Sequence, residues 1–281
     1  MELRTGDGRL ITLEIVGDQD ATPVFLCHGL ADSRLAAQWL TQAARELGLC
    51  VIAPDRPGSG GSDRHWLGHI ADWADDAAVV LDLLRVETAV FLGVSGGGPF
   101  AAACAARIPS RVRSLMLICP LGMPEWPTDS MALGERLSLL LASHAPAFGG
   151  WSLGLLAALA RRNPELFLWL TATNQSDVDI RTLQQPAARE SFLTCYVEAF
   201  RRGSWGVAQD LRLLTRPWGF DLGSITAPTS IHHGDADVTV PVQHARLYAR
   251  AIPGAQLQIH RGEGHFSIFS NPLDVLATLG G

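Results

Sequence analysis

A serine, a histidine and an aspartate in this chain could together perform acyl transfer. Ser95 lies in Gly93-Val94-Ser95-Gly96-Gly97, a match to the GxSxG pattern. A serine hydroxyl is a poor nucleophile at its ordinary pKa and needs a general base, and that base needs a carboxylate to fix its tautomer. His265 lies in a glycine-rich loop after an apolar run, where active sites form at the ends of parallel strands, so we predict that it is the base.

The residues around Ser95 distinguish it from a second GxSxG match. The apolar run 89–92 precedes Ser95 and a small-residue helical pattern follows it, which is the strand, turn and helix that a nucleophile elbow requires. The second match, at 150–154, follows a segment without a strand pattern. We therefore predict that Ser152 begins a helix and has no catalytic role.

Two aspartates could orient the base. Asp235 and Asp237 both follow a predicted strand at 229–232, and their spacing alone leaves both open. Directly after the apolar run 112–119, the other place where such an acid could lie, there is no acidic residue.

Metal and nucleotide chemistry are not predicted. His232 and His233 lie close to the two aspartates in sequence, but adjacent side chains point to opposite faces of a strand and would not share a metal. The GxSxG segment lacks the lysine of a phosphate-binding loop, and no GxGxxG follows the first buried strand. We expect no metal and no cofactor.

The oxyanion of an acyl-transfer reaction needs backbone N–H donors. Gly96, after the nucleophile, and Leu30, after His28-Gly29, are in the positions to supply them. His28 follows a short buried strand at 23–27, so we expect it to organise the turn, and it is also a candidate substrate contact. The other candidate contacts of an apolar substrate pocket are Trp126, Trp151, Trp169 and Phe266.

Buried strand patterns alternate with helical patterns over most of the chain, which predicts a parallel sheet flanked by helices. An N-terminal hairpin is expected around 10–16, and a single helix over 34–47. Residues 121–218 break this alternation: they contain five of the eight tryptophans and no buried strand pattern. They predict a helical insertion, with helices at 133–142, 152–161, 165–173, 188–202 and 207–214.

Composition excludes several classes of protein. The 281 residues carry a formal net charge of −6, which disfavours a sequence-independent grip on nucleic acid phosphates. All 22 basic residues are arginine, so lysine-dependent catalysis is excluded. The chain has five cysteines, an odd number, and most of them lie in apolar segments. This pattern indicates buried free thiols, as expected in a reducing compartment. With no secretory leader and no apolar run long enough to span a membrane, we expect a cytoplasmic protein without a membrane span that acts on a small molecule; its oligomeric state is not indicated.

Taken together, the motifs resemble those of the α/β-hydrolase superfamily. In chain order they are His28-Gly29, residues 55–63 (DRPGSGGSD), Gly93-Val94-Ser95-Gly96-Gly97, Gly234-x-x-Asp237 and Gly264-His265. The resemblance implies a mostly parallel eight-stranded sheet flanked by helices, with a helical lid inserted after strand 6. It thus implies a core domain of residues 1–120 and 219–281, and a lid of residues 121–218. It also selects Asp237 over Asp235 as the acid.

The activity this resemblance implies is hydrolysis through an acyl-enzyme. The Trp, Leu and Ala content of residues 121–218 suggests an apolar pocket, so we expect an apolar carboxylic ester or lactone as substrate. Carbon–carbon bond hydrolysis and cofactor-free perhydrolysis use the same triad and remain alternatives. A different class is a small-molecule receptor or signalling protein with slow turnover.

Overall fold

An eight-stranded sheet runs through the protein, whose computed structural model describes residues 1–172, 174–270 and 272–277. The strand order is β1-β2-β4-β3-β5-β6-β7-β8. The β1–β2 hairpin is antiparallel, β2 pairs antiparallel with β4, and every other pair is parallel. This confirms the predicted fold class. The strands are β1 Glu2–Arg4, β2 Leu10–Gly17, β3 Thr22–Cys27, β4 Leu49–Pro54, β5 Ala89–Val94, β6 Val112–Ile118, β7 Thr229–Gly234 and β8 Gln256–His260.

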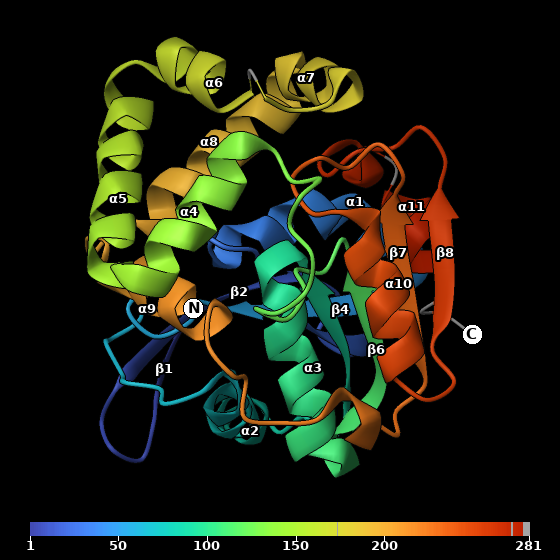
Figure 1. The fold of residues 1–281 in the computed structure, drawn as a ribbon. Helices are drawn as coiled ribbons and strands as arrows, with labels where there is room; N and C mark the ends of the chain where they lie inside the picture. Colours follow the sequence, from blue (N-terminus) through green and yellow to red (C-terminus); the bar gives the residue numbers. More distant parts are fainter. Residues whose placement is uncertain (173, 271, 278–281) are drawn as a thin grey trace.

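Helices cover both faces of the sheet (Figure 1). One face packs against α1 (Thr41–Leu47) and α11 (Pro272–Leu276). The other packs against α2 (Trp73–Leu83), α3 (Gly98–Arg107) and α10 (Val242–Ala251). Because the central strands are covered on both sides, they are continuous apolar runs rather than alternating ones.

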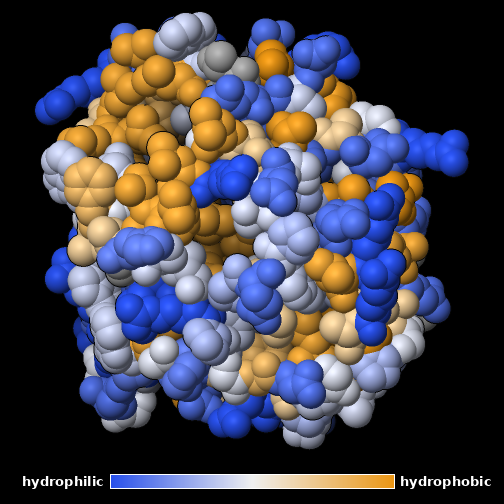
Figure 2. All heavy atoms as spheres, viewed as in Figure 1, coloured by the Kyte–Doolittle hydropathy of each residue, from blue (hydrophilic) through white to orange (hydrophobic). Residues whose placement is uncertain are grey.

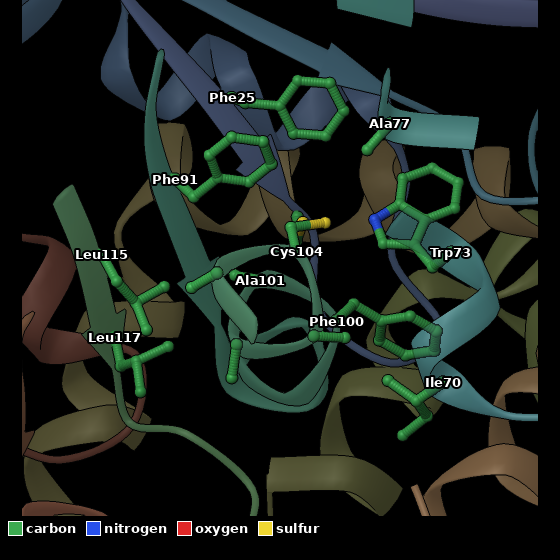
Figure 3. Close-up of a cluster of buried hydrophobic side chains, with 14 of the residues drawn as sticks. Phe25, Ile70, Trp73, Ala77, Phe91, Phe100, Ala101, Cys104, Leu115 and Leu117 are labelled. Atoms are coloured by element: carbon green, nitrogen blue, oxygen red, sulfur yellow. The ribbon is translucent and has the colours of Figure 1, made fainter. Parts of the chain in front are cut away.

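The larger core cluster lies between the sheet and the pair α2 and α3. Phe25 and Phe91, from neighbouring strands, stack with their ring centroids 4.9 Å apart. Trp73 packs against Phe25 on one side and edge-on against Phe100 on the other (Figure 3). This packing joins β3 and β5, and the two predicted site loops at His28 and Ser95 follow these strands.

One predicted helix differs in detail. The expected helix over 34–47 is a 3-10 helix, Arg34–Leu40, followed by α1. Ser33 caps the 3-10 segment by accepting a hydrogen bond from the N–H of Leu35.

Six α-helices lie between β6 and β7 in the described residues, and the segment that contains them, residues 121–218, is called the helical insertion. Five match the predicted patterns and α7 was not predicted. The insertion has its own apolar cluster, which includes Phe167, Tyr196 and Leu211. The helices are α4 Leu133–His144, α5 Pro146–Arg162, α6 Pro164–Ala172, α7 Asp177–Gln184, α8 Pro186–Ala199 and α9 Trp205–Leu214.

Large apolar side chains are exposed on the insertion. Figure 2 shows them gathered over α4, α5 and α6. Within the described part of the chain, no helix combines the length and apolarity needed to cross a membrane. The exposed side chains include Leu133, Leu137, Leu140, Phe148, Trp151, Leu155 and Trp169.

Candidate active site

Ser95 occupies a sharp turn between β5 and α3. Its φ angle is +53°, a left-handed conformation that is uncommon for a residue with a side chain. The turn is possible because the nearby residue Gly97 has no side chain. A Cβ at that position would lie 2.1 Å from the carbonyl oxygen of Cys27, which is too close. The geometry is that of the predicted nucleophile elbow, with the strained residue at the point where the strand becomes a helix.

The structure brings Ser95, His265 and Asp237 together, although they are far apart in sequence. His265 Nε2 lies 3.0 Å from Ser95 Oγ, within reach of its hydroxyl proton. His265 Nδ1 lies 2.7 Å from Asp237 Oδ2 and donates to it. The other oxygen of Asp237 accepts from the N–H groups of Thr239 (2.9 Å) and Val240 (2.8 Å). The carboxylate is therefore fixed in place, and the imidazole is held in the tautomer that leaves Nε2 free to accept a proton.

The charges of this cluster reinforce one another. Burial alone would raise the pKa of Asp237, but His265 and His233 oppose it, and the net pKa is lowered, so the carboxylate stays ionised. Burial alone would lower the pKa of His265, but the Asp237 charge and hydrogen bond outweigh it, and the net pKa is raised. The protonated form of the His265 imidazole is thus stabilised.

Asp235, the other acid that the spacing left open, lies elsewhere. Its Oδ1 accepts from the N–H of Gly262 at 2.7 Å and thereby closes the turn after β8. The two aspartates therefore have separate tasks, and Asp237 is the one beside His265.

The neighbouring histidines point to opposite faces of β7, as expected. His232 Nδ1 faces His260 Nε2 at 3.1 Å, whereas His233 Nε2 lies 3.3 Å from Asp237. Cys119, Asp237 and His265 each offer a ligand atom, all within 4.8 Å of one another. Burial and the Asp237 charge raise the pKa of the Cys119 thiol well above its ordinary value, and Asp237 and His265 are hydrogen-bonded to each other.

The predicted oxyanion donors lie next to each other. A Cβ on Gly96 would be 3.0 Å from the backbone nitrogen of Leu30, and both residues line the same cavity as Ser95. His28 is buried behind this loop: its Nδ1 lies 3.0 Å from the Gly29 carbonyl, and its Nε2 accepts from the N–H of Arg56. Burial and the charge of Arg56 lower its pKa well below the ordinary value. His28 is thus a neutral turn organiser and is not among the described residues that line the cavity.

A cavity of about 350 Å³ opens onto Ser95 and His265. Its walls are mostly apolar, and its size is within the range of small-molecule sites. Of the predicted substrate contacts, Phe266 lines it. Residues from the insertion that also line it include Met131, Glu135, Leu156, Phe192 and Tyr196.

The three tryptophans proposed as substrate contacts are placed elsewhere, and none is among the described lining residues. Trp126 packs edge-on against Tyr248, with centroids 5.0 Å apart. Trp151 and Trp169 are 55% and 65% exposed on the outer surface of α5 and α6. Helical periodicity shows which residues share a face, but in an insertion of several helices it does not show which face is turned inward. Trp39, which the sequence did not single out, lines the cavity.

Ser152, in the second GxSxG match, lies inside α5 and not at its start. Its hydroxyl donates to the carbonyl oxygen of Gly149 at 2.8 Å. α5 begins at Pro146, since proline is favoured in the first turn of a helix. The hydroxyl of this serine is therefore bonded within its own helix.

One residue that contacts the site is not predicted from the sequence. Asp179, on α7, is fully buried and accepts hydrogen bonds from the N–H groups of His265, Phe266 and Ser267. α7 is short and its segment is polar, so periodicity did not indicate it. The signal that could have found it is Ser176-x-x-Asp179, because serine followed three residues later by an acid is typical of a helix start.

Comparison with known proteins agrees with the fold described above. A family model described as alpha/beta hydrolase fold matches residues 22–272. An uncharacterized protein from Mycobacterium tuberculosis is 28% identical over 280 residues, covering 97% of this chain and 77% of its own length. The 2-hydroxymuconate semialdehyde hydrolase of Pseudomonas sp. (strain CF600) is 28% identical over 262 residues, covering 87% of this chain and 81% of its own. A thermophilic esterase from Thermogutta terrifontis has the same fold, with a TM-score of 0.71 at 23% identity and coverage of 99% and 96% of the two chains.

Proposed function

The chain belongs to the alpha/beta hydrolase fold family, and we propose that within it the protein is a serine hydrolase of apolar carboxylic esters or lactones. The observation that carries the proposal is the position of His265, 3.0 Å from Ser95 Oγ and 2.7 Å from Asp237, at one wall of an apolar cavity. We also propose that residues 1–120 and 219–281 form the core domain and that residues 121–218 are the lid that shapes the substrate pocket.

In the proposed mechanism His265 Nε2 takes the proton of Ser95 as Oγ attacks the ester carbonyl. The N–H groups of Leu30 and Gly96 hold the oxyanion that forms. His265 then gives its proton to the leaving alcohol, and an acyl-enzyme remains on Ser95. Water, deprotonated by the same imidazole, releases the acid and restores the serine. Asp237 stays ionised throughout and stabilises the imidazolium.

The charge of the cavity favours ester cleavage over the carbon–carbon bond alternative. Among the described lining residues, Asp32 and Glu135 are acidic, none is an arginine, and the chain contains no lysine. The compound 2-hydroxymuconate semialdehyde carries a carboxylate, which would need a cationic partner in a pocket of this kind. A neutral acyl group meets no such penalty against the apolar walls.

The test is turnover of p-nitrophenyl esters of increasing acyl length by the wild type and Ser95→Ala, with Ser152→Ala as the matched control. The proposal expects turnover that is lost in Ser95→Ala and kept in Ser152→Ala. Activity that persists in Ser95→Ala would overturn it. A single burst that then stalls would support the slow-turnover receptor instead, and intact-mass analysis after a small fluorophosphonate would show whether Ser95 had been acylated.

A further inference from the structure

The loop that carries His265 is held by a side chain from the helical insertion. This loop, residues 261–267 (the His265 loop), follows β8, whereas α7 precedes it by about eighty residues in the sequence. Figure 1 shows α7 next to the C-terminal segment of the fold. The contact between them is made by Asp179, whose side chain is fully buried.

Asp179 binds three consecutive backbone N–H groups. Its Oδ2 accepts from His265 at 2.8 Å, and its Oδ1 accepts from Phe266 at 2.8 Å and from Ser267 at 2.9 Å. A run of N–H groups that converge in this way forms a concave anion site, and hydrogen bonds to a carboxylate are stronger than those between neutral groups. The carboxylate therefore fixes the backbone of the residue whose side chain faces Ser95.

Two neighbouring residues, one on the insertion and one on the His265 loop, accommodate the Asp179 carboxylate in this position. Ser176 is the N-cap of α7, and its hydroxyl donates to Asp179 Oδ2 at 2.8 Å. On the loop side, a Cβ on Gly264 would lie 2.2 Å from the same oxygen, so only glycine leaves room for the carboxylate. A side chain on α7 and the absence of one on the His265 loop therefore both favour this position of the Asp179 carboxylate.

A second contact joins the same segment to the loop of the catalytic acid. Thr239 Oγ1 donates to Gln175 Oε1 at 2.7 Å, and the Thr239 N–H donates to Asp237. Residues 175–179 of the insertion therefore contact both loops that complete the triad. An insertion that moved away from the core would lose the bonds to both.

We propose that Asp179 is a positioning residue, which makes the placement of His265 beside Ser95 depend on the seating of the insertion. The inference rests on the proposed function, in which His265 is the base. Asp179 acts in two ways: it fixes the loop backbone, and its negative charge favours the protonated imidazole. That charge adds to the larger effect of Asp237 and acts beside Glu135 of α4, while burial opposes all three.

The test compares Asp179→Asn with Asp177→Asn, which makes the same charge change at an exposed position in the first turn of the same helix. In Asp179→Asn the new amide group would turn N–H donors toward the loop N–H groups. We expect kcat for the best p-nitrophenyl ester to fall on the order of 10²-fold, because small misplacements of a catalytic group have effects of this size. KM should stay nearly unchanged. The acid limb of the pH–rate profile should move to lower pH, because removing the charge lowers the pKa of His265. Asp177→Asn should match the wild type.

Two results for Asp179→Asn would overturn the proposal: wild-type kcat with a wild-type acid limb, or a loss of thermal stability and activity together with no shift of that limb. If Asp179→Asn does not fold, Ser176→Ala tests the same point more mildly. It removes one bond to Asp179 and should lower kcat in the same direction, and unchanged kcat would count against the proposal.

Labelling of Ser95 by a small fluorophosphonate separates this proposal from the proposed function, because it needs the base but no ester turnover. Slower labelling in Asp179→Asn supports the positioning role even if the wild type hydrolyses no ester offered. Equal labelling of the two proteins rejects that role, even if the wild type is an active esterase.

Discussion

Arg56 and Asp210 form a buried ion pair that joins the loop after β4 to helix α9 of the insertion. The Arg56 Nη2 to Asp210 Oδ2 distance is 2.8 Å, and both side chains are nearly inaccessible to solvent. The same guanidinium donates to the carbonyl oxygens of His28 (2.6 Å) and Gly29 (2.7 Å). It therefore also holds the turn that presents the N–H of Leu30.

Removing this cation should destabilise the fold strongly. Arg56→Ala leaves the Asp210 carboxylate buried without its partner, which costs about 3–5 kcal/mol of unfolding free energy. Urea unfolding followed by tryptophan fluorescence measures the change. The control is Arg136→Ala, which removes an exposed ion pair with Asp129 and should cost less than about 1 kcal/mol. Equal effects of the two changes would contradict the importance of the buried pair.

The two aspartates after β7 should differ sharply in their effect on catalysis. Asp237→Asn removes the acceptor that fixes the His265 tautomer, and kcat should fall by about 10⁴-fold with the fold intact. Asp235→Asn, two residues away, loses only a bond to the turn at Gly262 and should keep most of the activity. Steady-state kinetics on both variants checks this, and comparable losses would show that the acid is wrongly assigned.

The pH dependence of kcat/KM should report the titration of His265. The base works only when neutral, so the rate falls as the pH drops through its pKa. The Asp237 charge outweighs burial and raises that pKa, so the midpoint of the acid limb should lie above about 6.5, the ordinary value for histidine. A pH profile at constant ionic strength measures it, and a midpoint below the ordinary value would contradict the described balance of charges.

Carboxylate-bearing esters should be poor substrates. We expect kcat/KM for p-nitrophenyl hemiglutarate to be about 10²-fold below that for p-nitrophenyl valerate, because an unpaired buried carboxylate costs several kcal/mol. Burial raises the pKa of Asp32 to about 6, so the discrimination should grow as the pH rises through that value and this group ionises. The titration of His265 cancels in the ratio of the two substrates.

The variant for this prediction is Glu135→Gln, which removes a cavity carboxyl group from α4. It should reduce the discrimination against the hemiglutarate. Because the Glu135 charge also raises the pKa of His265, the acid limb should move to lower pH, and valerate turnover should stay close to that of the wild type only at pH values above that limb. If the hemiglutarate is hydrolysed as well as the valerate by the wild type, the charge of the cavity does not select the substrate.

The sheet and the elements around it were predictable because strands buried on both faces are short, continuous apolar runs in the sequence. The run Ala89–Val94, followed at once by small residues, indicated both β5 and the turn at Ser95. The choice between Asp235 and Asp237 was different. Both follow the same strand, so the local pattern does not distinguish them. The family motif favours Asp237, and in the structure Asp237 is the one that lies 2.7 Å from His265.

The inside of the insertion was less predictable, for a physical reason. Its helices pack on the core, on one another and around a cavity, so an apolar stripe does not tell which of these it faces. Trp151 and Trp169 lie on the outer surface, whereas Trp39, which is outside residues 121–218, lines the cavity. Asp179 was not predicted because its role depends on a hydrogen bond to His265, about eighty positions further along the chain. A local sequence pattern does not indicate a contact over that separation.

The contact between α7 and the His265 loop also limits how such a protein can be re-engineered. Exchanging residues 121–218 for the insertion of another hydrolase is an obvious way to change substrate preference. In this chain the exchanged piece would have to bring a carboxylate to the position of Asp179, or the N–H groups of His265, Phe266 and Ser267 would be left without their acceptor. The cavity lining and the His265 loop are therefore not separable modules, and a successful chimaera has to keep an α7 segment whose carboxylate fits against Gly264 of this chain.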